Sequence, residues 1–220
     1  MYQEHPSFKE PSRSNIKLWR YLDFTKFVSL IDKRALFFVR SDKLEDTFEG
    51  AITKKMSAYR KSTGGYKRVF LINSWHMNEY ESAAMWKLYL KSEEGVAIQT
   101  TFKRLTHSFI SKEHDVFAGK VKYTDYENEV IPEGNVFNRF LNKRKSFEHE
   151  KEVRAMILHA NNDGDESGTY VDVDLNTLIQ KVYLSPYSKK WFADLVRSTI
   201  DKYEIKTEVM NSNLVDKPFF

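Results

Sequence analysis

Apolar residues near the start of the chain follow a helical spacing, and a continuous apolar run comes after them. The spaced residues are Phe24, Phe27, Val28 and Ile31. A repeat of three or four positions predicts an amphipathic helix, and Asp23 stands where a helix cap is expected. The run from 35 to 39 is typical of a buried strand. We therefore expect a helix that leads into a strand ending at Arg40.

The same two patterns recur along the rest of the chain. Strands are expected at 69–72, 95–102, 115–124, 153–158 and 169–173. Helices are expected at 83–90, at 135–149 and around 191–200. The segment 161–165 (NNDGD) favours a turn, so the strands on either side of it are expected to form a hairpin.

This alternation indicates an α+β fold with a central mixed β-sheet and helices packed against its faces. No repeat or linker interrupts the chain, so residues 19–220 are expected to form a single domain preceded by an arm at 1–18. The 220 residues, 41% of them hydrophobic, are enough for one continuous core. Six residues within the apolar strand runs are expected to be buried: Phe37, Ile72, Val96, Ile98, Met156 and Leu158.

Composition narrows the class of protein. The absence of cysteine excludes disulfides, thiolate metal sites and a thiol nucleophile. No apolar run reaches the roughly 18 residues that cross a bilayer. The first residues lack the apolar stretch of a signal peptide, so a cytoplasmic location without membrane contact is expected. The formal net charge of +4 is compatible with nucleic-acid contact but does not argue for it.

Several catalytic motifs are missing from the sequence. Gly64 and Gly65 form an isolated pair rather than a phosphate-binding loop. The six histidines lack the spacing of a zinc site, so no metal is expected. No serine stands between glycines as in a nucleophile elbow. The sequence therefore supports neither a P-loop enzyme, a zinc protease nor a serine hydrolase.

Candidate chemistry remains in polar groups at the ends of apolar runs. The first group closes the first strand with Arg40. The second has Trp75 and His76 after a strand and continues into a helix. That helix bears Trp86 and Tyr89 three positions apart, so they share a face. This face serves either core packing or ring stacking on a ligand.

The third group lies at the start of a late strand and consists of Glu148, Glu150, Glu152 and Arg154. If the strand begins as early as Glu150, its period of two puts Glu150, Glu152 and Arg154 on one side. Two carboxylates and a guanidinium there suit a site, although a ladder on an exposed strand has the same residues. The basic run 143–145 fits a solvated helix face better than a phosphate-binding patch.

Four segments resemble the bacterial family known as domain of unknown function 2971. They are LFFVRSDKLEDTFE at 36–49, SWHMNEYESAAMWKLY at 74–89, FEHEKEVR at 147–154 and VDLNTLIQKVYLSP at 173–186. The resemblance covers most of the chain. The order of elements, with a Glu at the head of a late strand, is also similar to that of ADP-ribosyltransferases, particularly the DNA-modifying toxins.

The second resemblance implies NAD as the substrate and a nucleic acid or protein as the acceptor, in a toxin or phage-defence system. Breaking the nicotinamide glycosidic bond passes through an oxocarbenium-like state, and the resemblance assigns its stabilisation to Glu152. Glu150 or His76 would orient or deprotonate the acceptor.

The same resemblance implies a dinucleotide-binding surface. Arg40 would hold the pyrophosphate through charge-assisted hydrogen bonds. An aromatic ring from Trp75, Trp86 or Tyr89 would cover the nicotinamide. Arg40, the block from 75 to 86 and Glu152 are then expected to converge on one cleft.

Two other functions stay open. A metal-dependent nuclease would hold magnesium with Asp42, Asp46, Glu150 and Glu152, and would place the basic run on the nucleic-acid backbone. A non-catalytic binding or immunity module would use the acidic and aromatic groups as a surface. Dependence on divalent metal marks the nuclease, and specific ligand capture without turnover marks the binding module.

Overall fold

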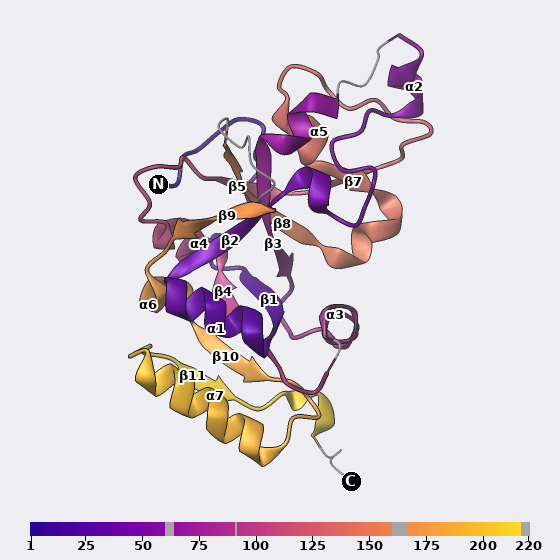
Figure 1. Ribbon diagram of the computed structural model, residues 1–220. Helices are drawn as coiled ribbons and strands as arrows, with labels where there is room; N and C mark the ends of the chain where they lie inside the picture. The colour runs from indigo at the N-terminus through magenta and orange to yellow at the C-terminus, as the bar shows by residue number, and fades with distance from the viewer. Residues whose placement is uncertain (60–63, 91, 160–166, 217–220) are drawn as a thin grey trace. The chain divides into compact units, whose positions relative to one another are not determined.

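The computed structural model describes residues 1–59, 64–90, 92–159 and 167–216 (Figure 1). The chain groups into two compact units, each built from three segments. The first unit contains Met1–Ser12, Phe37–Trp75 and Ser111–Val171. The second contains Arg13–Leu36, His76–Ile110 and Asp172–Phe220. Neither unit is a continuous stretch of sequence.

The first unit is organised around antiparallel strands. It contains β5 (Phe117–Lys120), β6 (Lys122–Thr124), β7 (Asn142–Arg144) and β8 (Glu152–Leu158), and most of β2 (Ala35–Arg40), β3 (Phe70–Met77) and β9 (Gly168–Asp172). Its helical segments are η1 (Ser41–Lys43), α2 (Lys54–Ser57), η2 (Gly64–Arg68), α5 (Phe137–Phe140) and η3 (Lys145–Glu150). β3 pairs with β2 and β8, and β8 also pairs with β5. The core of this unit is rich in aromatic residues, and Phe70 stacks on Phe140 with 4.3 Å between ring centres.

The second unit combines a sheet with longer helices. Its elements are β1 (Lys17–Asp23), α1 (Phe24–Lys33), α3 (Ala83–Tyr89), β4 (Gly95–Thr101), α4 (Phe102–Ser108), α6 (Leu175–Leu178), β10 (Lys181–Leu184), α7 (Lys190–Lys202), β11 (Glu208–Met210) and η4 (Asn213–Val215). β4 pairs with β1 and β10 in antiparallel fashion, whereas β10 and β11 are parallel. The sheet is therefore mixed.

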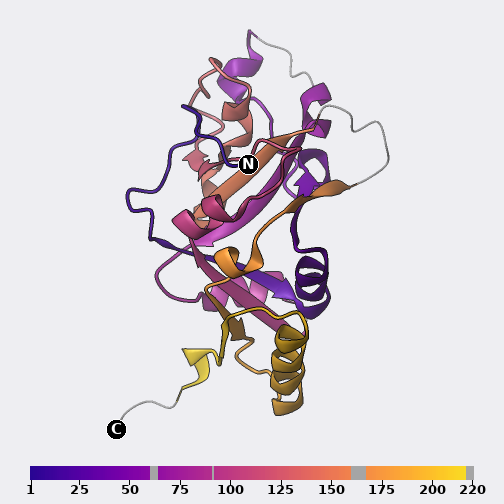
Figure 2. The ribbon, with the colours of Figure 1, turned by 90° about the vertical axis from the view of Figure 1, so that its left-hand side faces the viewer.

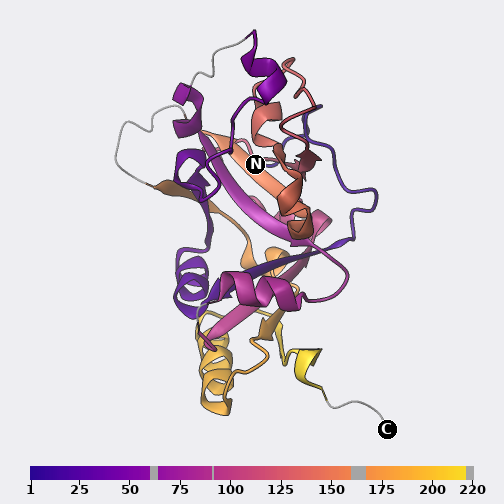
Figure 3. The ribbon, with the colours of Figure 1, turned by 90° about the vertical axis from the view of Figure 1, so that its right-hand side faces the viewer.

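Helices cover the strands of the second unit through large apolar side chains. Met85 and Trp86 of α3 pack on Trp19 and Tyr21 of β1. Figure 3 shows the ribbon of α3 next to β1. The ring centres of Phe24 in α1 and Phe192 in α7 lie 5.3 Å apart. Figure 2 shows these two helices as neighbours. Asp23 caps α1 as expected, because its carboxylate accepts the Lys26 N–H at 2.8 Å.

The predicted α+β class, with a mixed sheet and helices, is confirmed. The four strands predicted for the central sheet are present as β2, β3, β4 and β8. Four of the six residues expected in the core are buried: Ile72, Val96, Ile98 and Met156. Phe37 is only half-buried, and Leu158 is 48% exposed. Leu158 is the last residue of β8 and lies two residues past Met156, where the register with β5 ends. The division into an arm and one domain stays a prediction.

The long helix expected at 135–149 is wrong. The segment instead forms the short helix α5, then β7, then the turn η3. The side chain of Asn142 ends the helix, because it donates to the Asn138 carbonyl at 2.6 Å and accepts from Thr124 at 2.6 Å. β7 then pairs with β6 in parallel. The polar residues at 143–145, which favoured a helix with a solvated face, instead form ion pairs with carboxylates.

Two smaller expectations also differ from the structure. The strands on either side of 161–165 do not form a hairpin, because β8 pairs with β3 and β5 while β9 pairs with β2. The turn at 161–165 lies outside the described residues. The strand expected at 115–124 is broken at Val121, whose N–H donates to the Glu152 carbonyl at 2.9 Å.

Gly50 occupies a position that tolerates no side chain. Its φ of +69° is left-handed, and an added Cβ would lie 2.4 Å from Cε1 of Phe140. Gly50→Ala is expected to lower the free energy of unfolding by about 2 to 4 kcal/mol, from backbone strain together with overpacking. Gly134→Ala is the matched control, because no atom lies within 4 Å of its added Cβ. Chemical denaturation of both variants checks the prediction, and equal losses would contradict it.

Candidate functional site

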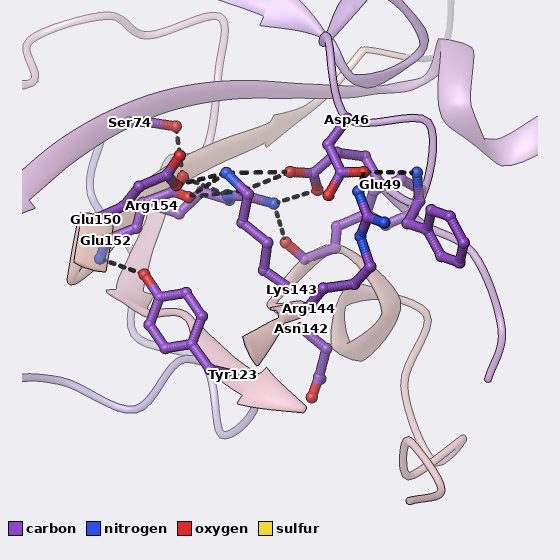
Figure 4. Close-up of polar contacts among 12 residues, drawn as sticks. Asp46, Glu49, Ser74, Tyr123, Asn142, Lys143, Arg144, Glu150, Glu152 and Arg154 are labelled. Atoms are coloured by element: carbon purple, nitrogen blue, oxygen red, sulfur yellow. Dashed lines mark hydrogen bonds and ion pairs between the residues drawn. The ribbon is translucent and has the colours of Figure 1, made fainter. Parts of the chain in front are cut away.

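Arg154 is the centre of a buried ionic network in the first unit (Figure 4). It follows Glu152, the first residue of β8, by two positions, so the period of a strand puts both side chains on one face. Nε and Nη2 of Arg154 donate to the Glu152 carboxylate at 2.7 and 2.9 Å. Nη1 and Nη2 donate to Glu49 at 2.8 and 2.9 Å, and Nη1 also donates to the Phe140 carbonyl at 2.5 Å. Every N–H of the guanidinium group therefore has an acceptor.

The three charged groups of this triad are removed from water. Arg154, Glu49 and Glu152 are 1%, 2% and 4% exposed. Burial alone would lower the pKa of Arg154, but the two carboxylates hold it well above its usual range. Because each charge depends on its buried partners, the loss of one partner leaves an uncompensated charge in the interior.

Lys143 brings a second cation to the same carboxylates. It lies in β7, and its Nζ is 2.5 Å from Glu150, 3.6 Å from Glu152 and 3.9 Å from Glu49. The side chain of Lys143 is 11% exposed, and that of Glu150 is 15% exposed. The ammonium group of Lys143 therefore lies among three carboxylates in a largely desolvated position.

The two neighbouring carboxyl groups differ in acidity. Burial would raise the pKa of Glu152, but Arg154, Lys143 and a hydrogen bond from Ser74 Oγ at 2.5 Å lower it from 4.5 to about 2. Burial raises the pKa of Glu150 above 4.5, and the ion pair with Lys143 offsets only part of this effect. One carboxylate is therefore held ionised while its neighbour takes up a proton more readily, a pattern typical of acid–base pairs.

The prediction that Glu150 and Glu152 share one face of a strand is wrong for Glu150. β8 begins at Glu152, so Glu150 is not a strand residue that shares a face by the period of two. Glu150 instead ends η3, and Lys151 between the two has a left-handed φ of 42°. This backbone bend brings both carboxylates to Lys143. Glu148 takes part through its carbonyl, which accepts the Lys151 N–H at 3.1 Å.

The acidity of Glu152 predicts how stability depends on pH. Its pKa is lower in the folded protein than the unfolded value of 4.5, so its contribution is present above pH 4.5 and is lost as the pH falls towards about 2. The ionised Glu150 acts in the opposite sense, because its pKa is raised. The difference in free energy of unfolding between wild type and Glu152→Gln should therefore shrink over this range. Urea denaturation at a series of pH values measures it, and a constant difference would contradict the assignment.

A further pair lies at the edge of the network. Arg144 Nη2 donates to Asp46 Oδ1 at 2.8 Å, and its guanidinium group lies over the ring of Phe48 at 4.2 Å. Two of the three basic residues at 143–145 are thus paired with buried carboxylates. The third, Lys145, is 58% exposed and lies 2.9 Å from Glu129. The solvated helix face expected for this run is therefore wrong.

Two other predicted residues of the first unit are buried. Arg40 is 3% exposed, and its Nε and Nη2 donate to the two Asp42 oxygens at 2.9 and 2.7 Å. These hydrogen bonds lower the pKa of Asp42. Trp75 is 1% exposed, and its Nε1 donates to Asn73 at 2.7 Å. Two of the three guanidinium nitrogens of Arg40 are therefore bound to Asp42.

The remaining predicted residues belong to the second unit. His76 and Trp86 are buried, and Trp86 Nε1 donates to Glu81 at 2.9 Å. The ring of Trp86 lies 4.9 Å from that of Tyr21, so Trp86 has the core-packing role. Tyr89 is 51% exposed. The convergence of Arg40, the 75–86 block and Glu152 on one cleft stays a prediction.

Sequence reasoning placed Glu150, Glu152 and Arg154 in one group, and the structure brings them together. It missed Glu49 and Lys143 as partners of that group. Glu49 follows no strand or helix period, and Lys143 was assigned to a predicted helix. The local signal that could have found Glu49 is its position next to Phe48, which favours partial burial, whereas both direct neighbours of Lys143 are polar.

Two further features are absent from the described residues. Among them, no three or more His, Asp or Glu side chains are grouped so that they could hold a metal ion. Within the same ranges, no helix is long and apolar enough to cross a membrane.

Fold and network together define a mixed-sheet α+β protein with a pair of carboxyl groups of unequal acidity at the start of a strand. No family model and no curated protein matches the sequence. Similar solved structures include three of DarT from Thermus sp. 2.9. The complex with ADP-ribosylated ssDNA has a TM-score of 0.45 and 6% identity, over 92% of this chain and 96% of that one. The complex with NAD+ has a TM-score of 0.44 and 5% identity, over 91% of this chain and 97% of that one. The complex with carba-NAD+ has a TM-score of 0.43 and 8% identity, over 90% of this chain and 96% of that one.

Proposed function

We propose that this chain is an NAD-dependent ADP-ribosyltransferase-like enzyme that uses Glu152 and Glu150 as its catalytic carboxyl groups. The observation that carries the proposal is their placement around Lys143 with diverging pKa values. Glycosidic chemistry requires two such groups, one charged in the transition state and one able to exchange a proton. NAD as the substrate comes from the resemblance of the segment order to ADP-ribosyltransferases.

Glu152 supplies negative charge. In the proposed step the bond between nicotinamide and the ribose C1′ breaks, and its electron pair leaves with the nicotinamide. Positive charge develops on the ribose, and a carboxylate that remains ionised stabilises it. The buried position of Glu152 strengthens this effect, because the surrounding dielectric is low. Arg154 and Ser74 hold the carboxylate in a fixed orientation.

Glu150 supplies proton transfer. A nucleophilic atom of the acceptor, from a nucleic acid or a protein, forms the new bond to C1′ and gives its proton to Glu150. The raised pKa of Glu150 makes it a better base than an ordinary carboxylate. Its side chain is 15% exposed, against 4% for Glu152, which makes Glu150 the more accessible of the two to an acceptor.

Nicotinamide release from NAD tests the proposal. Purified protein is incubated with NAD and with either single-stranded DNA, RNA or a protein mixture as acceptor, and modified acceptor is detected by mass spectrometry. Turnover should persist in excess EDTA and should fall as the pH drops through the raised pKa of Glu150. Glu150→Gln should remove this acid limb while leaving NAD binding by calorimetry intact.

Other outcomes point to the remaining functions. Cleavage of nucleic acid that EDTA abolishes, without nicotinamide release, would overturn the proposal in favour of a metal-dependent nuclease. Specific capture of a ligand without turnover would do so in favour of a binding or immunity module.

A further inference from the structure

One short segment holds both backbone polar groups of Glu152. The N–H of Val121 donates to the Glu152 carbonyl at 2.9 Å. The N–H of Glu152 donates to the phenol oxygen of Tyr123 at 2.8 Å, and Figure 4 shows this oxygen pointing at the start of β8. The phenol oxygen thus takes the place that a backbone carbonyl has in a regular sheet.

The same segment fixes the strand that carries Lys143. β6 pairs with β7 in parallel, and Tyr123 is the register partner of Lys143. The Nζ of Lys143 reaches the carboxylates of Glu150 and Glu152. Tyr123 therefore links the strand that carries Lys143 to the backbone of Glu152, one of the three acidic residues around the Lys143 ammonium group.

The held peptide follows a strained residue. Lys151 has a φ of 42°, which residues other than glycine rarely adopt and which persists only where neighbours hold it. The peptide N–H that Tyr123 accepts belongs to the next residue, Glu152. Without the phenol oxygen, Lys151 is free to relax towards an ordinary backbone conformation, which turns Glu150 away from Glu152.

We propose that Tyr123 is a positioning residue for the Glu150–Glu152 pair, because its phenol oxygen fixes the Glu152 peptide and so keeps both carboxylates at Lys143. The catalytic consequence rests on the proposed function. The contact itself can be tested without turnover.

Tyr123→Phe removes one oxygen atom and tests the role. Tyr126→Phe is the matched control, because Tyr126 is also a largely buried phenol of this unit and donates to the Asn142 carbonyl at 3.1 Å, not to Glu152. In Tyr123→Phe, NMR hydrogen exchange of the Glu152 amide should become at least about tenfold faster, since the amide loses its acceptor. The kcat for NAD should fall on the order of a hundredfold with little change in KM. The acid limb of the kcat profile should move to lower pH, because a displaced Glu150 is better hydrated.

In Tyr126→Phe, the hydrogen-exchange rate of the Glu152 amide and the acid limb of the kcat profile should be those of the wild type. Thermal midpoints of both variants show whether either is destabilised. The inference is overturned if Tyr123→Phe keeps wild-type exchange at Glu152, or if Tyr126→Phe loses as much kcat. If the wild type turns over no NAD, the proposed function fails, and the amide measurement still decides the positioning role. Should Tyr123→Phe not fold, the wild type decides instead: a protected Glu152 amide supports the contact, and rapid exchange overturns it.

Discussion

Arg154→Met is expected to lower the free energy of unfolding by about 3 to 5 kcal/mol, because it leaves two buried carboxylates without their hydrogen-bonded guanidinium group, and Lys143 Nζ lies 3.6 and 3.9 Å from them. Glu49 and Glu152 are 2% and 4% exposed, so water cannot replace the lost guanidinium group. The measurement is urea denaturation at pH 7, analysed with the same m-value for each variant. Arg13→Met is the control, because its pair with Glu79 at 3.0 Å is 65% and 46% exposed and should contribute less than about 1 kcal/mol.

A triple variant separates charge from packing. Adding Glu49→Gln and Glu152→Gln to Arg154→Met removes the uncompensated charges and should recover part of the lost stability. A triple variant that is less stable than Arg154→Met would contradict this explanation. The two carboxylates would then stabilise the fold through contacts other than their pairing with Arg154.

Glu152→Gln is expected to reduce NAD turnover on the order of a hundredfold or more, because it removes one charge from the proposed transition state while keeping the shape of the side chain. Glu152 is 4% exposed and paired with Arg154, so a measurable loss of stability should accompany the kinetic effect. Turnover is therefore compared at a temperature where both proteins are folded.

Glu49→Gln is the stability-matched comparison for this experiment. It also removes one of the two carboxylates of Arg154, so it should destabilise the protein to a similar degree. Turnover should fall much further in Glu152→Gln than in Glu49→Gln. Equal turnover in the two variants would make Glu152 a structural partner of Arg154 and end its catalytic role.

The parts of the fold that the sequence predicted are those specified locally. α1 follows from a helical apolar repeat and the Asp23 cap, and β4 follows from an apolar run that is buried on both faces. The failure at 135–149 has a physical cause. A polar residue that faces a buried carboxylate and one that faces water have the same spacing, so the pattern could not show that Lys143 points inward.

Of the candidate site, the sequence could predict only the pairing of residues that lie on the same strand, β8. Glu152 and Arg154 are two positions apart, and their pairing follows from the period of β8. Glu49 lies 105 positions before Arg154, and no local pattern connects residues at that separation. The left-handed backbone conformation of Lys151 could not be predicted either, because the sequence around it contains no glycine to indicate it.

The separation of Glu49 and Arg154 also sets an order of events during protein synthesis. At about 5 to 20 residues per second, a ribosome adds the 105 positions between them in about 5 to 20 seconds. During that interval the Glu49 carboxylate has no guanidinium partner, so the nascent segment 37–75 must stay hydrated until residues 111–171 arrive. Ribosome stalling between these two codons would therefore prolong a state that chaperones and proteases recognise, rather than release a half-assembled but functional unit.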